Sequence, residues 1–190
     1  MTPNKPHRQN LRLRDYDYSQ VGAYFVTICT DRRVILFGDV AERGMAPNDA
    51  GRAVEHCWLE IPNHFPNVKL DAFVVMPNHV HGIIFIVDST VGAKNISPLH
   101  HNSLPSQQSA VPRGTIGSIV RGFKIGVTKW FRENIPNAVV WQRNYYEHVI
   151  RSEASLNRIR QYILDNPAQW AFDRENPSAT VKEPENVWLA

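Results

Sequence analysis

The feature that most constrains the fold is a pair of apolar runs separated by a two-residue turn. Residues 68–76 and 80–87 are rich in valine, isoleucine and phenylalanine, which favour extended strands. Pro77 and Asn78 lie between these runs and are typical turn residues. The spacing therefore predicts an antiparallel hairpin.

Strand-like and helix-like patterns alternate along the rest of the chain. β-branched and aromatic runs predict strands, and apolar residues that recur every three to four positions predict helices. Asn48 is a suitable N-cap, while Pro62 and Pro167 are expected to end helices. The expected strands are 22–30, 34–37 and 139–141, the first two paired as a hairpin, and the expected helices are 48–61, 114–133 and 156–166.

The order of these elements is strand, helix, strand, strand, helix, strand, helix. This order is typical of an α+β fold of ferredoxin-like type, in which helices cover an antiparallel sheet. We expect one domain over residues 22–170, preceded by a basic N-terminal arm at 1–21 and followed by a loosely docked C-terminal extension at 171–190. The polar block at 88–112 is longer than most loops and is interpreted as a mobile insertion.

Composition narrows the class of protein. A chain of 190 residues with 43% hydrophobic and 21% charged residues has the make-up of a globular domain. The two cysteines, Cys29 and Cys57, are too few for a disulfide framework or a zinc ribbon, which fits a reducing cytoplasm. Because no apolar run reaches roughly 18 residues and the N-terminus lacks an apolar signal-peptide core, we expect neither a membrane span nor secretion.

Positive charge is concentrated in two segments. The formal net charge is +3 and the sequence pI is about 9.0. Residues 1–14 contain four lysines or arginines and no acid, and residues 113–133 contain five against Glu133 alone. Such clusters are typical of phosphate contacts, although the solvated face of a basic protein explains either cluster equally well.

His79 and His81 form the sharpest chemical motif. Side chains at positions i and i+2 leave a strand on the same face, so both imidazoles converge while Val80 points into the core. Two imidazoles make half of a metal site that suits Mn²⁺ or Zn²⁺, whereas Mg²⁺ prefers oxygen ligands. For the pair alone, two polar residues at the end of a strand remain the commoner case.

Tyr162 and Asn166 lie four residues apart in the last expected helix and so share one face. A tyrosine beside a metal-bound phosphate can act as a nucleophile, and an asparagine carbonyl can serve as a third ligand. From these residues alone, a boundary tyrosine and an asparagine that ends the helix before Pro167 are the simpler interpretation.

Four segments, taken together, resemble one family. They are Tyr24–Thr30, Phe73–Ile83, Trp141–His148 and Arg160–Pro167. In this order they are similar to the IS200/IS605-type single-tyrosine transposases, and more closely to the REP-associated tyrosine transposases. The similarity extends over about residues 14–170.

The resemblance implies a His-hydrophobic-His nuclease fold that cleaves and rejoins hairpin-associated single-stranded DNA through a 5′-phosphotyrosine. It implies that His79, His81 and Asn166 hold a divalent ion, Mg²⁺ or Mn²⁺, and that Tyr162 is the nucleophile. Several family members carry glutamine where this chain has Asn166. The implied partner is a REP-like DNA hairpin, the implied location is the cytoplasm in association with the nucleoid, and the implied state is a monomer or a homodimer.

Cations on the helix at 114–133 and in the arm are candidates for DNA binding. Arg121, Lys124 and Lys129 interleave with the apolar stripe of that helix and are the best candidates for contacts to the DNA backbone. The resemblance suggests that the arm, with Arg12 and Arg14, helps to read a guide sequence beside a hairpin.

The segment at 143–148 is both polar and aromatic. Arg143 and His148 are assigned to phosphate contacts or to structural hydrogen bonds, with neither preferred. Tyr145 and Tyr146 are expected to pack in the protein or to stack on DNA bases.

Two other functions stay open at this point. One is a domesticated protein that binds hairpin DNA or RNA without turnover. The other is a metallonuclease that uses water at an ion held by His79 and His81, and it would release products with no protein attached.

Overall fold

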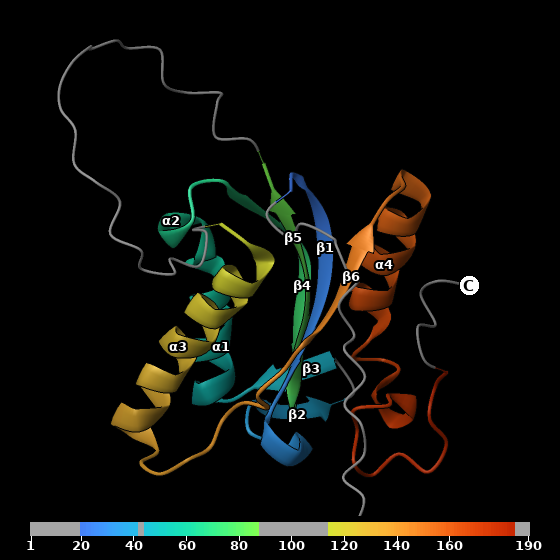
Figure 1. Cartoon of the computed structure of the whole chain (residues 1–190). Helices are drawn as coiled ribbons and strands as arrows, with labels where there is room; N and C mark the ends of the chain where they lie inside the picture. The colour runs from blue at the N-terminus through green and yellow to red at the C-terminus, as the bar shows by residue number, and fades with distance from the viewer. Residues whose placement is uncertain (1–19, 42–43, 88–113, 185–190) are drawn as a thin grey trace, which may run out of the picture.

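The structure, a computed structural model, describes residues 20–41, 44–87 and 114–184 (Figure 1). The arm up to residue 19 and the expected insertion at 88–112 lie outside the described residues. No helix within the described ranges is both long and apolar enough to cross a membrane. In chain order the elements are β1 (Gly22–Cys29), β2 (Gly38–Ala41), β3 (Gly44–Pro47), α1 (Asp49–Leu59), α2 (Ile61–His64), β4 (Val68–Met76), β5 (His79–Ile86), α3 (Ile116–Asn134), β6 (Tyr146–Ile150) and α4 (Glu153–Asp165), with short 3-10 turns at Asp31–Arg33 and Trp170–Phe172.

The main sheet has four strands in the order β4-β5-β1-β6, and all neighbours are antiparallel. The predicted hairpin forms between β4 and β5, with Met76 opposite His79 across the Pro77–Asn78 turn. A separate two-stranded sheet pairs β2 with β3. The order of elements and the antiparallel sheet confirm the predicted α+β fold of ferredoxin-like type.

Helices cover both faces of the main sheet (Figure 1). On one face, α1 and α3 bury Trp58 and Phe123 in the larger of two apolar clusters. On the other face, Ile159 and Ile163 of α4 pack in a smaller cluster that includes Phe25 and is completed by strand residues. The sheet therefore separates an extensive core from a thinner layer beneath α4.

The segment 34–37 is not a strand, so the hairpin predicted with β1 is wrong. The backbone N–H groups of Leu36 and Phe37 both donate to the carbonyl of Pro77, at 2.9 and 3.0 Å, which is a loop contact and not a ladder. Phe37 is fully buried and packs on Phe131 and Trp141. The apolar residue at position 37 therefore anchors a loop to the core and does not indicate a strand.

Pro62 does not end helical structure as predicted. The α1 helix begins after Asn48, whose side chain caps Gly51 as expected, and it ends at Leu59. A second short helix, α2, then begins at Ile61 with Pro62 in its first turn. Proline is well tolerated there because the first N–H groups of a helix have no partner within the helix.

The last strand of the sheet does not lie at 139–141, where the sequence pattern predicted it. Residues 139–141 form no strand, and Trp141 makes only an isolated bridge to Thr30. The strand at this edge of the sheet, which pairs with β1 on the side away from β5, is β6, and its residues 146–150 include a glutamate and a histidine. Because β6 is an edge strand with partly exposed residues, it lacks the continuous apolar run from which a strand is predicted.

Gly82 in β5 is required by close packing on the side of α1. A Cβ built on Gly82 would lie 2.2 Å from a ring carbon of Trp58. Trp58 is fully buried between Phe73 and Phe123, so its ring cannot move aside without disturbing the core. The glycine thus lets the indole lie directly against the strand that carries His81.

We expect Gly82→Ala to lower the free energy of unfolding by about 1–3 kcal/mol, the usual range for an overpacked core. Gly126→Ala is the matched control, because a Cβ at Gly126 would meet Cys57 Sγ at an ordinary 3.4 Å in the middle of α3. The control should be neutral or stabilising, since alanine is the better helix former. Urea unfolding followed by circular dichroism measures both, and equal effects would contradict the packing argument.

Candidate active site

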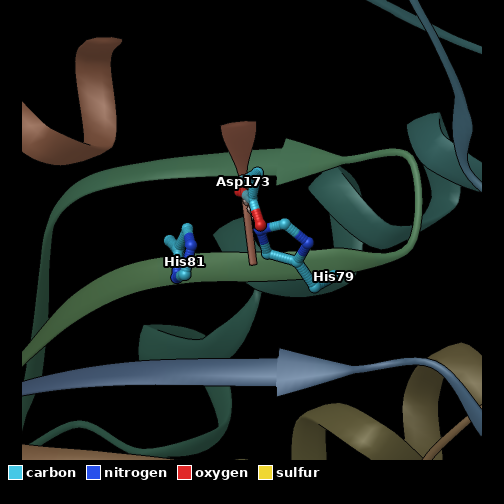
Figure 2. Close-up of side chains that lie close together, drawn as sticks. All are labelled: His79, His81 and Asp173. Atoms are coloured by element: carbon cyan, nitrogen blue, oxygen red, sulfur yellow. Dashed lines mark ion pairs between the residues drawn. The ribbon is translucent and has the colours of Figure 1, made fainter. Parts of the chain in front are cut away.

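The β5 strand brings His79 and His81 together on the face of the sheet covered by α4 (Figure 2). Val80 points to the opposite face, into the cluster beneath α1 and α3, as predicted from the strand alternation. The two imidazole centroids are 4.4 Å apart, and the side chains expose 0% and 2% of their surface. The predicted convergence of the two histidines is therefore present in the fold.

Each imidazole has a hydrogen-bond partner at Nδ1. His79 Nδ1 lies 2.9 Å from Asn78 Oδ1, and His81 Nδ1 lies 2.9 Å from Thr27 Oγ1 on the neighbouring strand β1. Such contacts fix the orientation of a histidine ring and leave Nε2 to face the site.

Asp173 joins the two histidines from beyond the end of α4 (Figure 2). Its Oδ2 lies 3.6 Å from His79 Nε2, and its side chain is 1% exposed. One potential ligand atom from each of these three residues lies within 4.8 Å of those of the other two. The predicted loose docking of residues 171–190 is wrong for part of this segment, because Asp173, Glu175 and Asn176 are all buried.

Asn166, which the family resemblance implies as a third ligand, also lies beside His79 and Asp173. It is the C-cap of α4 and is 1% exposed, and its amide is close enough to act on the pKa values of His79 and Asp173. Even so, neither of its side-chain polar atoms reaches hydrogen-bonding geometry with a partner in the described part of the chain. The same is true of His79 Nε2 and Asp173 Oδ2.

Burial keeps both imidazoles neutral. Loss of contact with water lowers the pKa of His79 to about 4 and that of His81 to about 3, and for His81 the neighbouring His79 lowers it further. Burial also raises the pKa of Asp173. At neutral pH each histidine therefore offers a lone pair and no positive charge.

The donor set fits a divalent ion. Buried polar atoms that lack hydrogen bonds are costly, and here such atoms of His79, Asn166 and Asp173 meet at one point. Imidazole nitrogens with carboxylate and amide oxygens suit Mn²⁺ and related ions, and the oxygens also suit Mg²⁺. A metal ion held among these residues would accept lone pairs from His79 Nε2, Asp173 Oδ2 and Asn166 Oδ1, whereas the amide nitrogen of Asn166 could not bind it.

Tyr162 lies next to this cluster. Its Oη is 3.4 Å from His81 Nε2 and donates a 2.9 Å hydrogen bond to Glu183 Oε1. Its ring packs edge-on against Phe25 and His81. Burial, with the nearby Glu183 charge, raises the pKa of the phenol above its ordinary value, so the hydroxyl is protonated at neutral pH.

The position of Tyr162 follows from how α4 is anchored. Ser152 caps the first turn by accepting a hydrogen bond from the N–H of Ser155. Arg160 then makes two hydrogen bonds to the carboxylate of Asp71 in β4, at 2.9 and 2.6 Å. With Ile159 buried against the sheet, the helix rotation that presents Tyr162 to His81 is fixed.

Four of the predicted DNA-binding residues line one open pocket of about 570 Å³ beside α3. Arg121, Lys124 and Lys129 come from the helix and Arg143 from the segment before β6, and Arg132 also contributes. Lys124 Nζ donates to the carbonyls of residues 142 and 144, so it also holds that segment against α3. None of the described residues that line the pocket is acidic.

His148 is separated from that pocket. It lies in β6 opposite Phe25, and its neighbours Tyr146 and Ile150 at alternate positions pack in the cluster under α4. Burial lowers its pKa. Arg12 and Arg14 lie outside the described residues.

The sequence did not predict Asp173, Glu183 or Asn78 as residues of the site. No periodic pattern runs through residues 173–184, so nothing in the sequence showed that this segment folds back onto the strand.

Comparison with known proteins places this fold in a class. The chain shares its fold with a REP-associated tyrosine transposase solved in complex with a REP hairpin, at 21% sequence identity and a TM-score of 0.52. The match covers 84% of this chain and 73% of that one. The fold is thus that of the transposases to which the sequence motifs are similar.

A relative by sequence is an uncharacterised protein of Haemophilus influenzae, 47% identical over 168 residues. These residues make up 88% of this chain and 92% of the relative. The chain therefore belongs to the same family as that protein. No family model matches the sequence.

The buried histidines make stability depend on pH. In the unfolded chain both imidazoles take up protons near pH 6.5, whereas their pKa values in the folded protein are about 4 and 3. The unfolded state therefore binds more protons below pH 6.5, and stability should fall as the pH drops from about 6.5 toward 4. We expect the melting temperature of the metal-free protein to fall more steeply with decreasing pH over this window than that of His81→Gln. Calorimetry in EDTA measures both. Identical slopes of melting temperature against pH would contradict the lowered pKa of His81.

Proposed function

We propose that the protein is a metal-dependent endonuclease and strand transferase for single-stranded DNA, with Tyr162 as its nucleophile. The observation that carries this proposal is the 3.4 Å between Tyr162 Oη and His81 Nε2, which puts the phenol beside buried atoms able to hold a metal ion. The fold shared with the REP-associated tyrosine transposase supports it. We extend the hairpin named for that neighbour to this chain, as a substrate of hairpin-bearing single-stranded DNA.

In this proposal His79, His81, Asp173 and Asn166 hold one divalent ion, Mg²⁺ or Mn²⁺. A bound ion supplies Lewis acidity and a template for in-line displacement at a phosphate. The protein contributes a rigid, water-poor cluster, because these ligands are 0–2% exposed.

Tyr162 performs the covalent step. Its Oη forms a bond to phosphorus as the bond from phosphorus to the 3′-oxygen breaks, which leaves a 5′-phosphotyrosine and a 3′-hydroxyl. Glu183 already accepts the hydrogen bond of the phenol and is the group placed to take its proton. Because the phosphotyrosine retains the energy of the diester, a 3′-hydroxyl can reverse the step without ATP.

Tyr162→Phe should abolish covalent attachment of DNA while changing the affinity for DNA by less than about twofold, because only the hydroxyl is removed. The substrate is a single-stranded hairpin from the gene's own flanks, labelled at its 3′ end, incubated with Mn²⁺ or Mg²⁺ and run on a denaturing gel. Tyr146→Phe is the matched control, because Tyr146 also packs against Phe25 on this face of the sheet. Wild type and the control should both give a labelled band that migrates with the protein.

Two results would contradict the proposal. Cleaved strands without attached protein, in equal amount from wild type and Tyr162→Phe, would indicate a nuclease that uses water. Hairpins that are bound but never cut would indicate a binding protein that retains the transposase fold.

We propose that the basic pocket beside α3 binds the DNA backbone. Arg121, Lys129 and Arg143 approach it from two segments, and Lys124 keeps those segments together. The pocket lies on the side of the sheet covered by α3, whereas the metal ligands lie on the side covered by α4. DNA held at both places would have to pass around the sheet.

The double variant Arg121→Ala/Lys129→Ala should weaken DNA binding and flatten its dependence on salt. Each phosphate contact to single-stranded DNA contributes about 0.7 to the slope of log affinity against log salt, so the slope should fall by about 1.4. Arg52→Ala, on the exposed surface of α1 outside the pocket, should leave the slope unchanged. Fluorescence anisotropy at several salt concentrations provides the test, and an unchanged slope in the double variant would exclude this surface.

A further inference from the structure

Asn78 is a fully buried polar side chain at the turn between β4 and β5. It makes three side-chain hydrogen bonds. Its Nδ2 donates to the backbone carbonyls of Arg33 at 3.0 Å and of Glu175 at 2.8 Å, and its Oδ1 lies 2.9 Å from His79 Nδ1. One side chain thus joins a metal-ligating histidine to two distant segments of the chain.

The two carbonyls determine which way the amide points. A backbone carbonyl can only accept a hydrogen bond, so the NH₂ group of Asn78 must face Arg33 and Glu175. The oxygen of the amide is then left to face His79. Because this oxygen also only accepts, His79 must carry its proton on Nδ1, which leaves the lone pair on Nε2, the atom nearest Asp173.

The contact with Glu175 also bears on the position of Asp173. The N–H of Glu175 donates to Asp173 Oδ1 at 2.6 Å, and the Glu175 carboxylate pairs with Arg33. Burial acts to raise the pKa of Glu175, but Arg33 outweighs it and keeps this carboxylate ionised. Asn78 therefore bonds directly to the residue whose backbone orients the carboxylate of Asp173.

We infer that Asn78 is a positioning residue that couples the Nδ1–H tautomer of His79 to the docking of residues 173–176. Metal binding and docking of this segment then strengthen each other, because a coupling free energy between two sites acts in both directions. The inference rests on the metal site of the proposed function and assigns no chemical step to Asn78.

Thr27 provides a comparison within the same site. Its hydroxyl lies 2.9 Å from His81 Nδ1, as the amide of Asn78 does from His79. A hydroxyl can either donate or accept, so it does not select a tautomer. In the described part of the chain the Thr27 side chain hydrogen-bonds to His81 and not to residues 173–176, so its loss should affect His81 and not docking.

Three measurements on the full chain test the inference. Nitrogen-15 NMR of the imidazoles in the metal-free wild type should show the proton of His79 on Nδ1. Titration calorimetry with Mn²⁺ should show about 10–100-fold weaker binding for Asn78→Leu, the usual effect of removing a partner of a metal ligand. Hydrogen exchange of residues 173–176 should be faster in Asn78→Leu and slowed less by Mn²⁺ than in wild type.

Two further variants separate the parts of this coupling. Thr27→Val should weaken Mn²⁺ binding while hydrogen exchange of residues 173–176 stays as in wild type. Arg33→Met, at a side chain 44% exposed, should speed that exchange and weaken Mn²⁺ binding while His79 keeps its Nδ1 proton. Arg33→Met and the wild-type NMR measurement decide the matter even if Asn78→Leu does not fold.

A proton on Nε2 of His79 in the wild type would overturn the inference. So would an Asn78→Leu protein that binds Mn²⁺ and protects residues 173–176 as the wild type does, or an Arg33→Met protein with unchanged Mn²⁺ affinity. None of these measurements uses DNA. A protein that behaves as expected here but forms no covalent DNA adduct would refute the proposed function and leave the inference intact.

Discussion

The alternation of side chains along β5 is the constraint on which the rest of the structure depends. His79 and His81 face α4, while Val80 and the bare backbone of Gly82 face the large core beneath α1 and α3. Trp58 packs closely against Gly82 on the core face of β5, which fixes the strand. The imidazoles on its other face therefore cannot shift without disturbing the core. The two histidines of the cluster are therefore held in place by packing on the opposite face of the sheet.

Burial has opposite consequences for different groups in this site. It keeps the histidines neutral and so able to bind a metal ion, but it also raises the pKa of Tyr162 and makes loss of the phenolic proton harder. Partial burial beside Glu183 thus keeps the phenol of Tyr162 protonated and unreactive, while burial of the histidines keeps them neutral. The entry of a phosphate and a cation would change this balance, because positive charge near the phenol favours its ionised form.

The parts of the site that could be predicted from sequence are those set by local periodicity. Two histidines at a strand spacing and a tyrosine with an asparagine at a helix spacing share a face whatever surrounds them, and His79, His81, Tyr162 and Asn166 do meet in the fold. Asp173 could not be found in this way, because it is placed by a segment without regular structure. The position of β6 was missed for a related reason, since an edge strand needs no continuous apolar run.

The contacts that complete the cluster join parts of the chain that are far apart. Asn78 and Glu175 are separated by 97 positions, and Arg33 and Glu175 by 142. During synthesis a ribosome releases the strand with both histidines long before it releases Asp173. The nascent chain therefore carries both imidazoles before the carboxylate of Asp173 has been synthesised, and the three-residue cluster can form only after that carboxylate has emerged.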